Sequence, residues 1–316
     1  MGKPVMAKIF DNKVFQDADA ARLWLETRLW KDGPICGHCG TVDGARALSS
    51  RPGTYQCNAC RKQFTVTVGT VFERSHIPLN KWLMATFLFT SSKKGISAHQ
   101  MHRLLDVTYK SAWFMMHRLR EAVAPAGGEG PLGGAGKVVE ADETFIGKKE
   151  GKRKADGASG YAHKRAVLSL VERGGRIRSF KIGSASRDDI APAIFANVHP
   201  DSTLHTDGSQ IYKFLGATAG HEIVDHNKTY VRKSNGGAKV HTNTLEGFFS
   251  VFKRGMVGTY QHCGEQHLHR YLAEFDFRQN TRAKLGIDDE ARAEKALKGI
   301  VGKRLTYRRT NQAAHA

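Results

Sequence analysis

The chain has 316 residues, 40% of them hydrophobic, and carries 49 Lys and Arg against 30 Asp and Glu, a formal charge of +19 at pH 7. This length allows two or three domains with cores of their own. The apolar runs are too short to span a membrane, and residues 1–14 lack the apolar core of a secretory signal, so we expect a cytoplasmic, nucleoid-associated protein with no membrane partner. The charge favours a polyanion as partner, and nucleic acid is the first candidate.

Four of the five cysteines form two CxxC pairs about twenty residues apart, which is the ligand spacing of a structural zinc site. A pair of disulfides is the disfavoured alternative in a chain without an export signal. Strand-like segments at 55–57 and 61–66 complete the prediction of a zinc ribbon. The fifth cysteine, Cys263, lies near three histidines, but their spacing puts no ligand trio on one helical face. The predicted zinc ligands are Cys36, Cys39, Cys57 and Cys60.

A helical region is predicted around the ribbon and after it. Residues 17–29 predict a helix that packs on the ribbon, and three more helices are expected at 79–90, 97–105 and 108–123. A short helix, a tight turn at 106–107 and a longer basic helix fit a helix-turn-helix, whose second helix reads bases. A plain helical bundle that uses its basic residues for solubility is the alternative.

Residues 125–136 read PAGGEGPLGGAG, a composition that predicts a flexible linker and the clearest domain boundary. Downstream, the pattern predicts three strands, then helix, strand, helix, strand and helix. The first strand covers 137–146, with Asp142 on its polar face. A basic, glycine-rich segment at 148–164 follows, and a mobile nucleic-acid contact or a solvated hairpin would explain it equally well.

Residues 241–260, HTNTLEGFFSVFKRGMVGTY, predict an amphipathic helix late in that series. Thr244 is the expected N-cap, and the helix is expected to stop at Gly255 after a Lys-Arg pair that suits a C-terminus. Glu246 and Lys253 share one face, at positions i and i+7. A surface charge beside a core stripe is the plain alternative. The apolar stripe consists of Leu245, Phe248, Phe249 and Phe252.

This element order suits an α/β domain of the ribonuclease-H-like type, whose usual site has one carboxylate mid-way along the first strand, a second at the end of the fourth, and a third on a later helix. In this chain those positions are Asp142, Asp207 and Glu246. Three such carboxylates can hold two divalent cations roughly 3.5–4 Å apart, one activating the attacking water or sugar hydroxyl and the other stabilising the leaving oxygen of a phosphodiester. Hard oxygen ligands and a phosphate substrate favour Mg²⁺, with Mn²⁺ able to substitute.

Together these motifs resemble a bacterial insertion-sequence transposase of the group that joins an N-terminal zinc ribbon to a DDE (Asp-Asp-Glu/Asn-Lys) catalytic domain. The stretches that carry the resemblance are CGHC, CNAC, VEADETFIG, LHTDG, HTNTLEGFFSVFKRGMVGTYQH and HLHRYLAEFDFRQNTR, between Phe15 and Arg282. The resemblance implies that Asp142, Asp207 and Glu246 are metal ligands. It also implies that Lys253 contacts a phosphate near the cleavage point.

The resemblance further implies an activity and partners. The activity is nicking at the ends of a mobile element by hydrolysis, followed by attack of the freed 3′-hydroxyl on target DNA. The partners are terminal inverted repeats and target DNA, bound by a homodimer or a higher synaptic complex. Contacts from Lys and Arg to phosphates would make affinity salt-dependent, and a few side chains of the 108–123 helix would read bases. The candidate DNA contacts are Lys110, Arg118, Arg120, Lys253 and Arg254.

Several neighbours of the predicted ligands have open roles. Some relatives use Asn in place of the third acid, and Asn243 sits one turn before Glu246. Either of two acidic neighbours of Asp142 could be mistaken for the first ligand, and two nearby histidines have no clear family role. These four residues are Glu140, Glu143, His205 and His241.

The predicted fold class is multidomain: a small zinc ribbon, a helix-turn-helix-like helical region and a ribonuclease-H-like α/β catalytic domain. Two rivals remain to the active transposase. One is a catalytically inactive zinc-ribbon DNA-binding regulator derived from a transposase, and the other is a structure-specific or RNA-directed nuclease of the same fold. The expected divisions are 15–72 for the N-terminal helix and ribbon, 78–124 for the helical region, 125–136 for the linker, 137–282 for the DDE domain and 283–316 for a basic tail.

Overall fold

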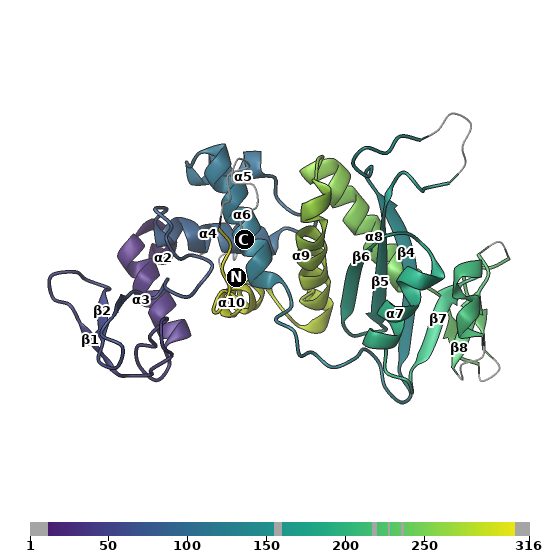
Figure 1. Cartoon of the computed structure of the whole chain (residues 1–316), viewed down its shortest axis with the longest axis horizontal. Helices are drawn as coiled ribbons and strands as arrows, with labels where there is room; N and C mark the ends of the chain where they lie inside the picture. The colour runs from purple at the N-terminus through teal and green to yellow at the C-terminus, as the bar shows by residue number, and fades with distance from the viewer. Residues whose placement is uncertain (1–11, 155–159, 217–219, 227, 235–236, 307–316) are drawn as a thin grey trace, which may run out of the picture. The chain divides into compact units, whose positions relative to one another are not determined.

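The computed structural model describes residues 12–154, 160–216, 220–226, 228–234 and 237–306 (Figure 1). The chain divides into two compact units, which we call unit 1 (Met1–Ala124 and Ile287–Ala316) and unit 2 (Pro125–Gly286). Unit 1 is therefore built from both ends of the chain, with unit 2 inserted between them. No described helix is long and apolar enough to cross a membrane.

Unit 1 begins with α2 (Lys13–Gln16) and α3 (Ala18–Leu29), followed by the predicted ribbon. The ribbon is a three-stranded antiparallel sheet of β1 (Ala45–Ala47), β2 (Tyr55–Cys57) and β3 (Gln63–Phe64) in that order. Trp30 packs edge-on against Tyr55 and Phe64, with ring centroids 5.2 and 5.8 Å away. This aromatic cluster gives the small sheet the core that its three short strands cannot supply.

The described part of unit 1 has four further helices: α4 (Leu79–Ser91), α5 (Ala98–Leu105), α6 (Tyr109–Val123) and α10 (Asp289–Lys298). Asp106 ends α5 in the left-handed region, with φ of 48°, and Thr108 caps α6 by accepting from the backbone N–H of Ser111. The tight turn expected between these two helices is present.

The sequence predicted a separate basic tail at 283–316. In the structure, the segment from Ile287 onward belongs to unit 1. Helix α10 packs on α4 and α6. Beyond it, the backbone N–H of Val71 donates to Ile300 and that of Gly302 donates to Gly69, so the segment pairs with the end of the ribbon. Ile300 is fully buried there. These contacts tie residues 289–302 into the core of unit 1.

Unit 2 is built on a five-stranded mixed sheet in the order β6-β5-β4-β7-β8. β4, β5 and β6 form an antiparallel meander, whereas β7 and β8 run parallel to β4 and to each other. The strands are β4 (Val138–Ile146), β5 (Arg165–Glu172), β6 (Ile177–Ile182), β7 (Thr203–Asp207) and β8 (His221–Val224). A two-stranded hairpin, β9 (Arg232–Lys233) and β10 (Lys239–Val240), precedes the last helices.

Helices cover both faces of this sheet (Figure 1). One face packs against α7 (Arg187–Asn197) and η1 (Gln210–Leu215). The sequence predicted a helix at η1, and the structure has a 3₁₀ helix there. The other face packs against α8 (Asn243–Gly255) and α9 (Leu268–Asn280). Short helical turns η2 (Met256–Tyr260), η3 (Glu265–His267) and η4 (Ala283–Leu285) join and follow them. The multidomain α/β class is therefore present.

The glycine-rich segment 125–136 is partly built into unit 2. Leu132 is fully buried, and its backbone exchanges hydrogen bonds with Asn197 and His199. Gly133 has φ of 90°, and a side chain there would collide with Ser202. Composition alone indicates flexibility, but the apolar side chain of Leu132 anchors the second half of this segment beside α7.

Candidate functional site

Helix α8 presents the predicted apolar stripe to the core and the predicted polar face to solvent. Leu245 and Phe252 are fully buried, while Glu246, Ser250 and Lys253 are exposed. The helix begins at Asn243, and the N-cap residue Thr242 makes no side-chain capping bond. The expected N-cap, Thr244, instead lies in the first turn, and the chain continues past Gly255 into the π-helical turn η2.

The first two predicted acids lie on neighbouring parallel strands. β4 and β7 pair with Val138 beside Thr203 and Glu140 beside His205. Asp142 and Asp207 each follow the last of these pairs by two residues, and Asp207 is close enough for its charge to raise the pKa of Asp142. Because side chains alternate along a strand, both acids lie on the sheet face that α8 covers.

The third acid comes close enough to act electrostatically on the first. Burial raises the pKa of Asp142, and three neighbouring carboxylates act in the same direction, bringing it to about 8. The largest of these charge effects come from Glu143, then Asp207, then Glu246. A crowd of partly buried carboxylate oxygens of this kind suits a hard divalent cation, which would relieve the repulsion.

The distances between possible ligand atoms separate the two predicted metal sites. Among the described residues, the four predicted cysteines are the only group of three or more His, Cys, Asp or Glu whose ligand atoms all lie within 4.8 Å of one another. The three acids are therefore more widely spread than a ligand set around one ion. Two ions roughly 3.5–4 Å apart have a wider ligand set, and the spread is compatible with such a pair. Cys263 and its neighbouring histidines form no ligand group in this described part of the chain.

The four cysteines meet at one point of the ribbon. Sγ of Cys36 lies 3.7 Å from Sγ of Cys60, and Sγ of Cys39 lies 3.6 Å from Sγ of Cys57. Each CxxC pair closes a tight turn, in which the backbone N–H of Gly40 and of Arg61 donates to the first cysteine of its pair. Four thiolates in this arrangement match the closed tetrahedral set of a structural Zn²⁺.

Residues that the sequence left open now have positions. Glu140 is fully buried and accepts from the backbone N–H groups of Thr244 and Leu245, at 3.0 and 3.2 Å. Its carboxylate therefore caps α8 and is already hydrogen-bonded to the backbone of that helix. Glu143 accepts from the hydroxyl of Tyr212 at 2.7 Å, and burial raises its pKa.

Two further residues escaped the sequence reasoning. His226 Nδ1 lies 3.3 Å from Glu246 Oε1, and its other nitrogen lies 3.1 Å from Thr242 Oγ1. Arg173, in the turn after β5, pairs with the buried Glu140 at 3.0 Å. Neither residue lies in a recognisable motif, and both reach the site only through the fold.

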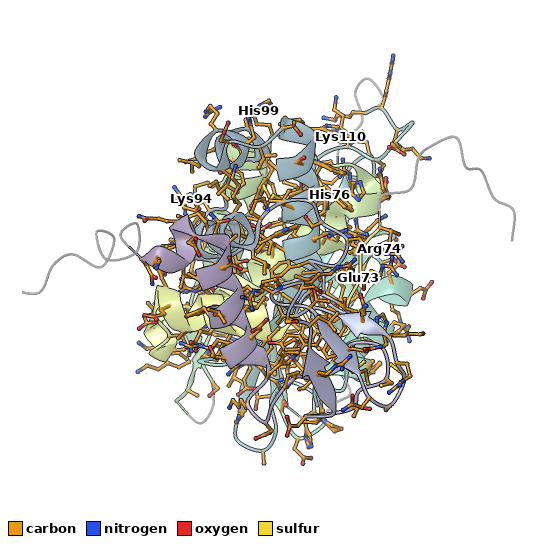
Figure 2. All side chains as sticks on the ribbon, turned by 90° about the vertical axis from the view of Figure 1, so that its left-hand side faces the viewer. Glu73, Arg74, His76, Lys94, His99 and Lys110 are labelled. Atoms are coloured by element: carbon orange, nitrogen blue, oxygen red, sulfur yellow. The ribbon has the colours of Figure 1, made fainter. Side chains whose placement is uncertain are left out.

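The candidate DNA contacts divide into exposed and buried groups. Lys253 and Arg254 are exposed on α8, and Lys110 is exposed near the start of α6. Figure 2 shows Lys110 near His99, whose ring stacks on Tyr109 with centroids 4.3 Å apart. Arg118 and Arg120 are only 7% and 1% exposed, which argues against the predicted DNA contact for both.

Packing explains this correction. Nη1 of Arg118 donates to the backbone oxygen of Glu73 at 3.0 Å, and its guanidinium lies over the ring of Phe114. The C-terminal half of α6 lies inside unit 1, packed by α4 and α10. Only the N-terminal end of α6 remains available, and this is the end that a helix-turn-helix presents to bases.

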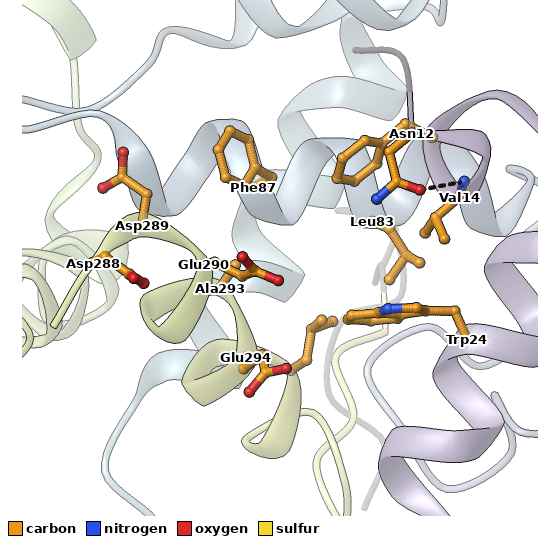
Figure 3. Close-up of a pocket in the computed structure, with 12 residues that line it drawn as sticks. Asn12, Val14, Trp24, Leu83, Phe87, Asp288, Asp289, Glu290, Ala293 and Glu294 are labelled. Atoms are coloured by element: carbon orange, nitrogen blue, oxygen red, sulfur yellow. Dashed lines mark hydrogen bonds between the residues drawn. The ribbon is translucent and has the colours of Figure 1, made fainter. Parts of the chain in front are cut away.

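Unit 1 also contains a cavity of about 690 Å³ (Figure 3). Its walls are largely apolar and its rim is acidic. No predicted site residue lines it. The apolar walls include Trp24, Leu83 and Phe87, and the acidic rim is formed by Asp288, Asp289, Glu290 and Glu294.

Two segments of the chain match known protein families. Residues 131–280 match the family described as ISXO2-like transposase domain, and residues 16–63 match the transposase zinc-ribbon domain. The chain therefore carries an ISXO2-like transposase domain behind a transposase zinc ribbon. This transposase is also 29% identical, over 286 residues, to an uncharacterized protein in transposable element ISH50 of Halobacterium salinarum. That alignment covers 84% of this chain and 92% of the relative.

The family assignment gives the two sites their context. The cysteine cluster lies in the segment that matches the zinc ribbon, so the transposase carries a zinc-binding N-terminal module. Asp142, Asp207 and Glu246 all lie in the segment that matches the DDE transposase domain. As a transposase, the protein acts on DNA.

Proposed function

We propose that unit 2 is a ribonuclease-H-like DDE domain that cleaves element ends and joins them to target DNA. Asp142, Asp207 and Glu246 would hold two Mg²⁺ ions, with Mn²⁺ able to replace them. Such ions activate an attacking water or 3′-hydroxyl and stabilise the leaving oxygen of the phosphodiester. The observation that carries this proposal is the register of β4 and β7, whose last pair, Glu140 with His205, lies two residues before both Asp142 and Asp207 on the same sheet face.

Further observations support the proposal. The sheet order supports the ribonuclease-H-like assignment. Strands β4, β5 and β6 form an antiparallel meander, and the parallel strands β7 and β8 continue the sheet beside β4. The raised pKa of Asp142, caused first by burial and then by neighbouring carboxylates, supports a site that a cation would stabilise. Lys253 lies two helical turns after Glu246 on the exposed face of α8, where its ammonium can meet a phosphate of the DNA end.

We propose that unit 1 recognises the terminal inverted repeats. The ribbon (15–72), the helical region (78–124) and the C-terminal segment (283–316) would act together, and 137–282 would carry the chemistry. Lys110 lies at the exposed N-terminal end of α6, the position from which a recognition helix enters the major groove. Joining two ends requires two sites, so the working form would be a homodimer or a higher synaptic complex.

One experiment tests this function. Purified protein is incubated with a labelled element-end fragment, a target plasmid and Mg²⁺, and compared with Asp207→Asn. The control is Asp201→Asn, which changes an exposed carboxylate just before the other end of β7. We expect joined products from the wild type and from the control, and none from Asp207→Asn. Joining by Asp207→Asn would remove this residue from the site, and cleavage without joining would identify a nuclease.

A further inference from the structure

The guanidinium of Arg173 lies where the chain segments leading to all three proposed metal ligands meet. Arg173 follows β5 directly, and its backbone N–H donates to the carbonyl of Val138 at the start of β4. Its side chain is 27% exposed and points at Glu140, two residues before Asp142. The position is therefore fixed by the backbone as well as by the side chain.

The contacts of Arg173 reach three separate elements. Nε and Nη2 lie 3.1 and 3.0 Å from Glu140 Oε1 on β4. Nη2 also lies 3.1 Å from Nδ1 of His205 on β7. The same nitrogen donates to the backbone oxygen of His241 at 3.0 Å, in the segment that leads into α8. One planar group thus touches a residue shortly before each acid.

Glu140, which Arg173 holds in place, is also hydrogen-bonded to the first turn of α8. Its carboxylate accepts from the backbone N–H groups of Thr244 and Leu245, and Thr244 Oγ1 donates to it at 2.9 Å. No side chain of the helix's own N-cap does this. A carboxylate at the first turn also suits the helix dipole. The start of α8 is therefore held on β4 by Glu140, and Glu246 follows within one turn.

We propose that Arg173 is a positioning residue for the strand-transfer site, which sets the spacing of Asp142, Asp207 and Glu246 through Glu140, His205 and the His241 carbonyl. This inference rests on the proposed function of those three acids. Arg173 does not touch them and would take no part in the chemistry. It fits the role because a guanidinium has donors in several fixed directions within one plane, which a lysine ammonium on a flexible stem cannot reproduce.

The test compares Arg173→Lys with the wild type. Lysine keeps the positive charge beside Glu140 but loses the simultaneous contacts to His205 and to the His241 carbonyl. We expect end binding in Mg²⁺-free buffer to change less than about twofold, because unit 1 is untouched. The cleavage rate should fall, or the Mg²⁺ concentration for half-maximal cleavage should rise, by about 10–100-fold, as is usual for residues that orient metal ligands.

A second readout needs neither metal nor activity. Hydrogen exchange in Mg²⁺-free buffer should become faster at the first turn of α8, including the Thr244 and Leu245 amides, while the ribbon stays unchanged. Arg178→Lys is the matched control, because Arg178 on β6 is also held by several partners, the carboxylate of Glu129 and the amide oxygen of Asn197 among them. This control should match the wild type in both measurements.

A double variant covers the case in which Arg173→Lys fails to fold. Arg173→Met with Glu140→Gln removes both charges, so that neither is left buried without its partner. This variant should fold, and its cleavage rate should fall, or its Mg²⁺ concentration for half-maximal cleavage should rise, as in Arg173→Lys. Wild-type Mg²⁺ dependence in either folded variant would overturn the inference. Activity that survives Asp142→Asn would instead refute the proposed function, so the two failures are distinguishable.

Discussion

Replacing Asp142 by Asn should stabilise unit 2 when Mg²⁺ is absent, even though it should abolish catalysis. The pKa of Asp142 rises from 3.8 to about 8 in the folded chain. Because the folded value is the higher one, the stability that this carboxyl contributes is complete below pH 3.8 and is lost as the pH rises towards 8. At pH 7 the carboxyl is ionised in the unfolded chain but mostly protonated in the folded one, and this difference lowers the free energy of unfolding by about 4 kcal/mol.

Asparagine removes the charge but keeps a polar group that must also be desolvated. We therefore expect roughly half of that cost to be recovered, about 2 kcal/mol, which for a unit of this size raises the melting temperature by about 4–8 °C. Calorimetry at pH 6, 7 and 8 would measure this, after dialysis to remove Mg²⁺. A chelator has to be avoided because it would strip Zn²⁺ from the ribbon.

The pH dependence makes this prediction specific. The difference between Asp142→Asn and the wild type should grow from pH 6 to pH 8, and adding Mg²⁺ should stabilise the wild type more than the variant. Asp201→Asn, which changes an exposed carboxylate outside the site, should show neither effect. A variant that melts at or below the wild-type temperature at pH 8 would refute the electrostatic reasoning.

Three further outcomes follow from unit 1. Cys39→Ser should lower the bound zinc and weaken binding to element ends, measured by metal analysis and a gel-shift assay; full zinc content would contradict the assigned ligand set. Lys110→Ala should weaken end binding and reduce the slope of log affinity against log salt concentration by about 1. Arg118→Ala should instead lower the melting temperature of unit 1, because Arg118 is buried. The reverse pattern would show that burial does not separate the two residues. Truncation after Gly286 should destabilise unit 1 because it removes the buried side chains of Leu297 and Ile300, and unchanged hydrogen exchange in α4 would count against this.

Local patterns in the sequence predicted the parts of the site that depend on local geometry. The zinc ligands follow from the two CxxC spacings, because each pair is closed by its own tight turn. The apolar stripe of α8 follows from helical periodicity, and so does the exposure of Glu246 and Lys253 on the opposite face. In each case the relevant neighbours lie within a few residues of one another.

The failures come from long-range packing. Arg118 and Arg120 lie on a face of α6 that reads as polar, but the helix is enclosed from several sides, and α10 arrives from the other end of the chain. The capping of α8 by Glu140 joins residues more than 100 positions apart. The burial of Glu140 near the start of β4, which requires a partner for its charge, became visible only in the structure. Its partner, Arg173, lies in a turn that no motif distinguishes.

Glu140 and Asp142 show how one strand separates structural from functional charge. Both lie on the same face of β4, two residues apart. Glu140 has an arginine, two backbone amides and a hydroxyl as partners, so its charge is used inside the protein. Burial raises the pKa of Asp142, and the charges of the neighbouring carboxylates raise it further. Folding thus satisfies the first carboxylate and leaves the second dependent on added positive charge, which is the condition a divalent cation would meet.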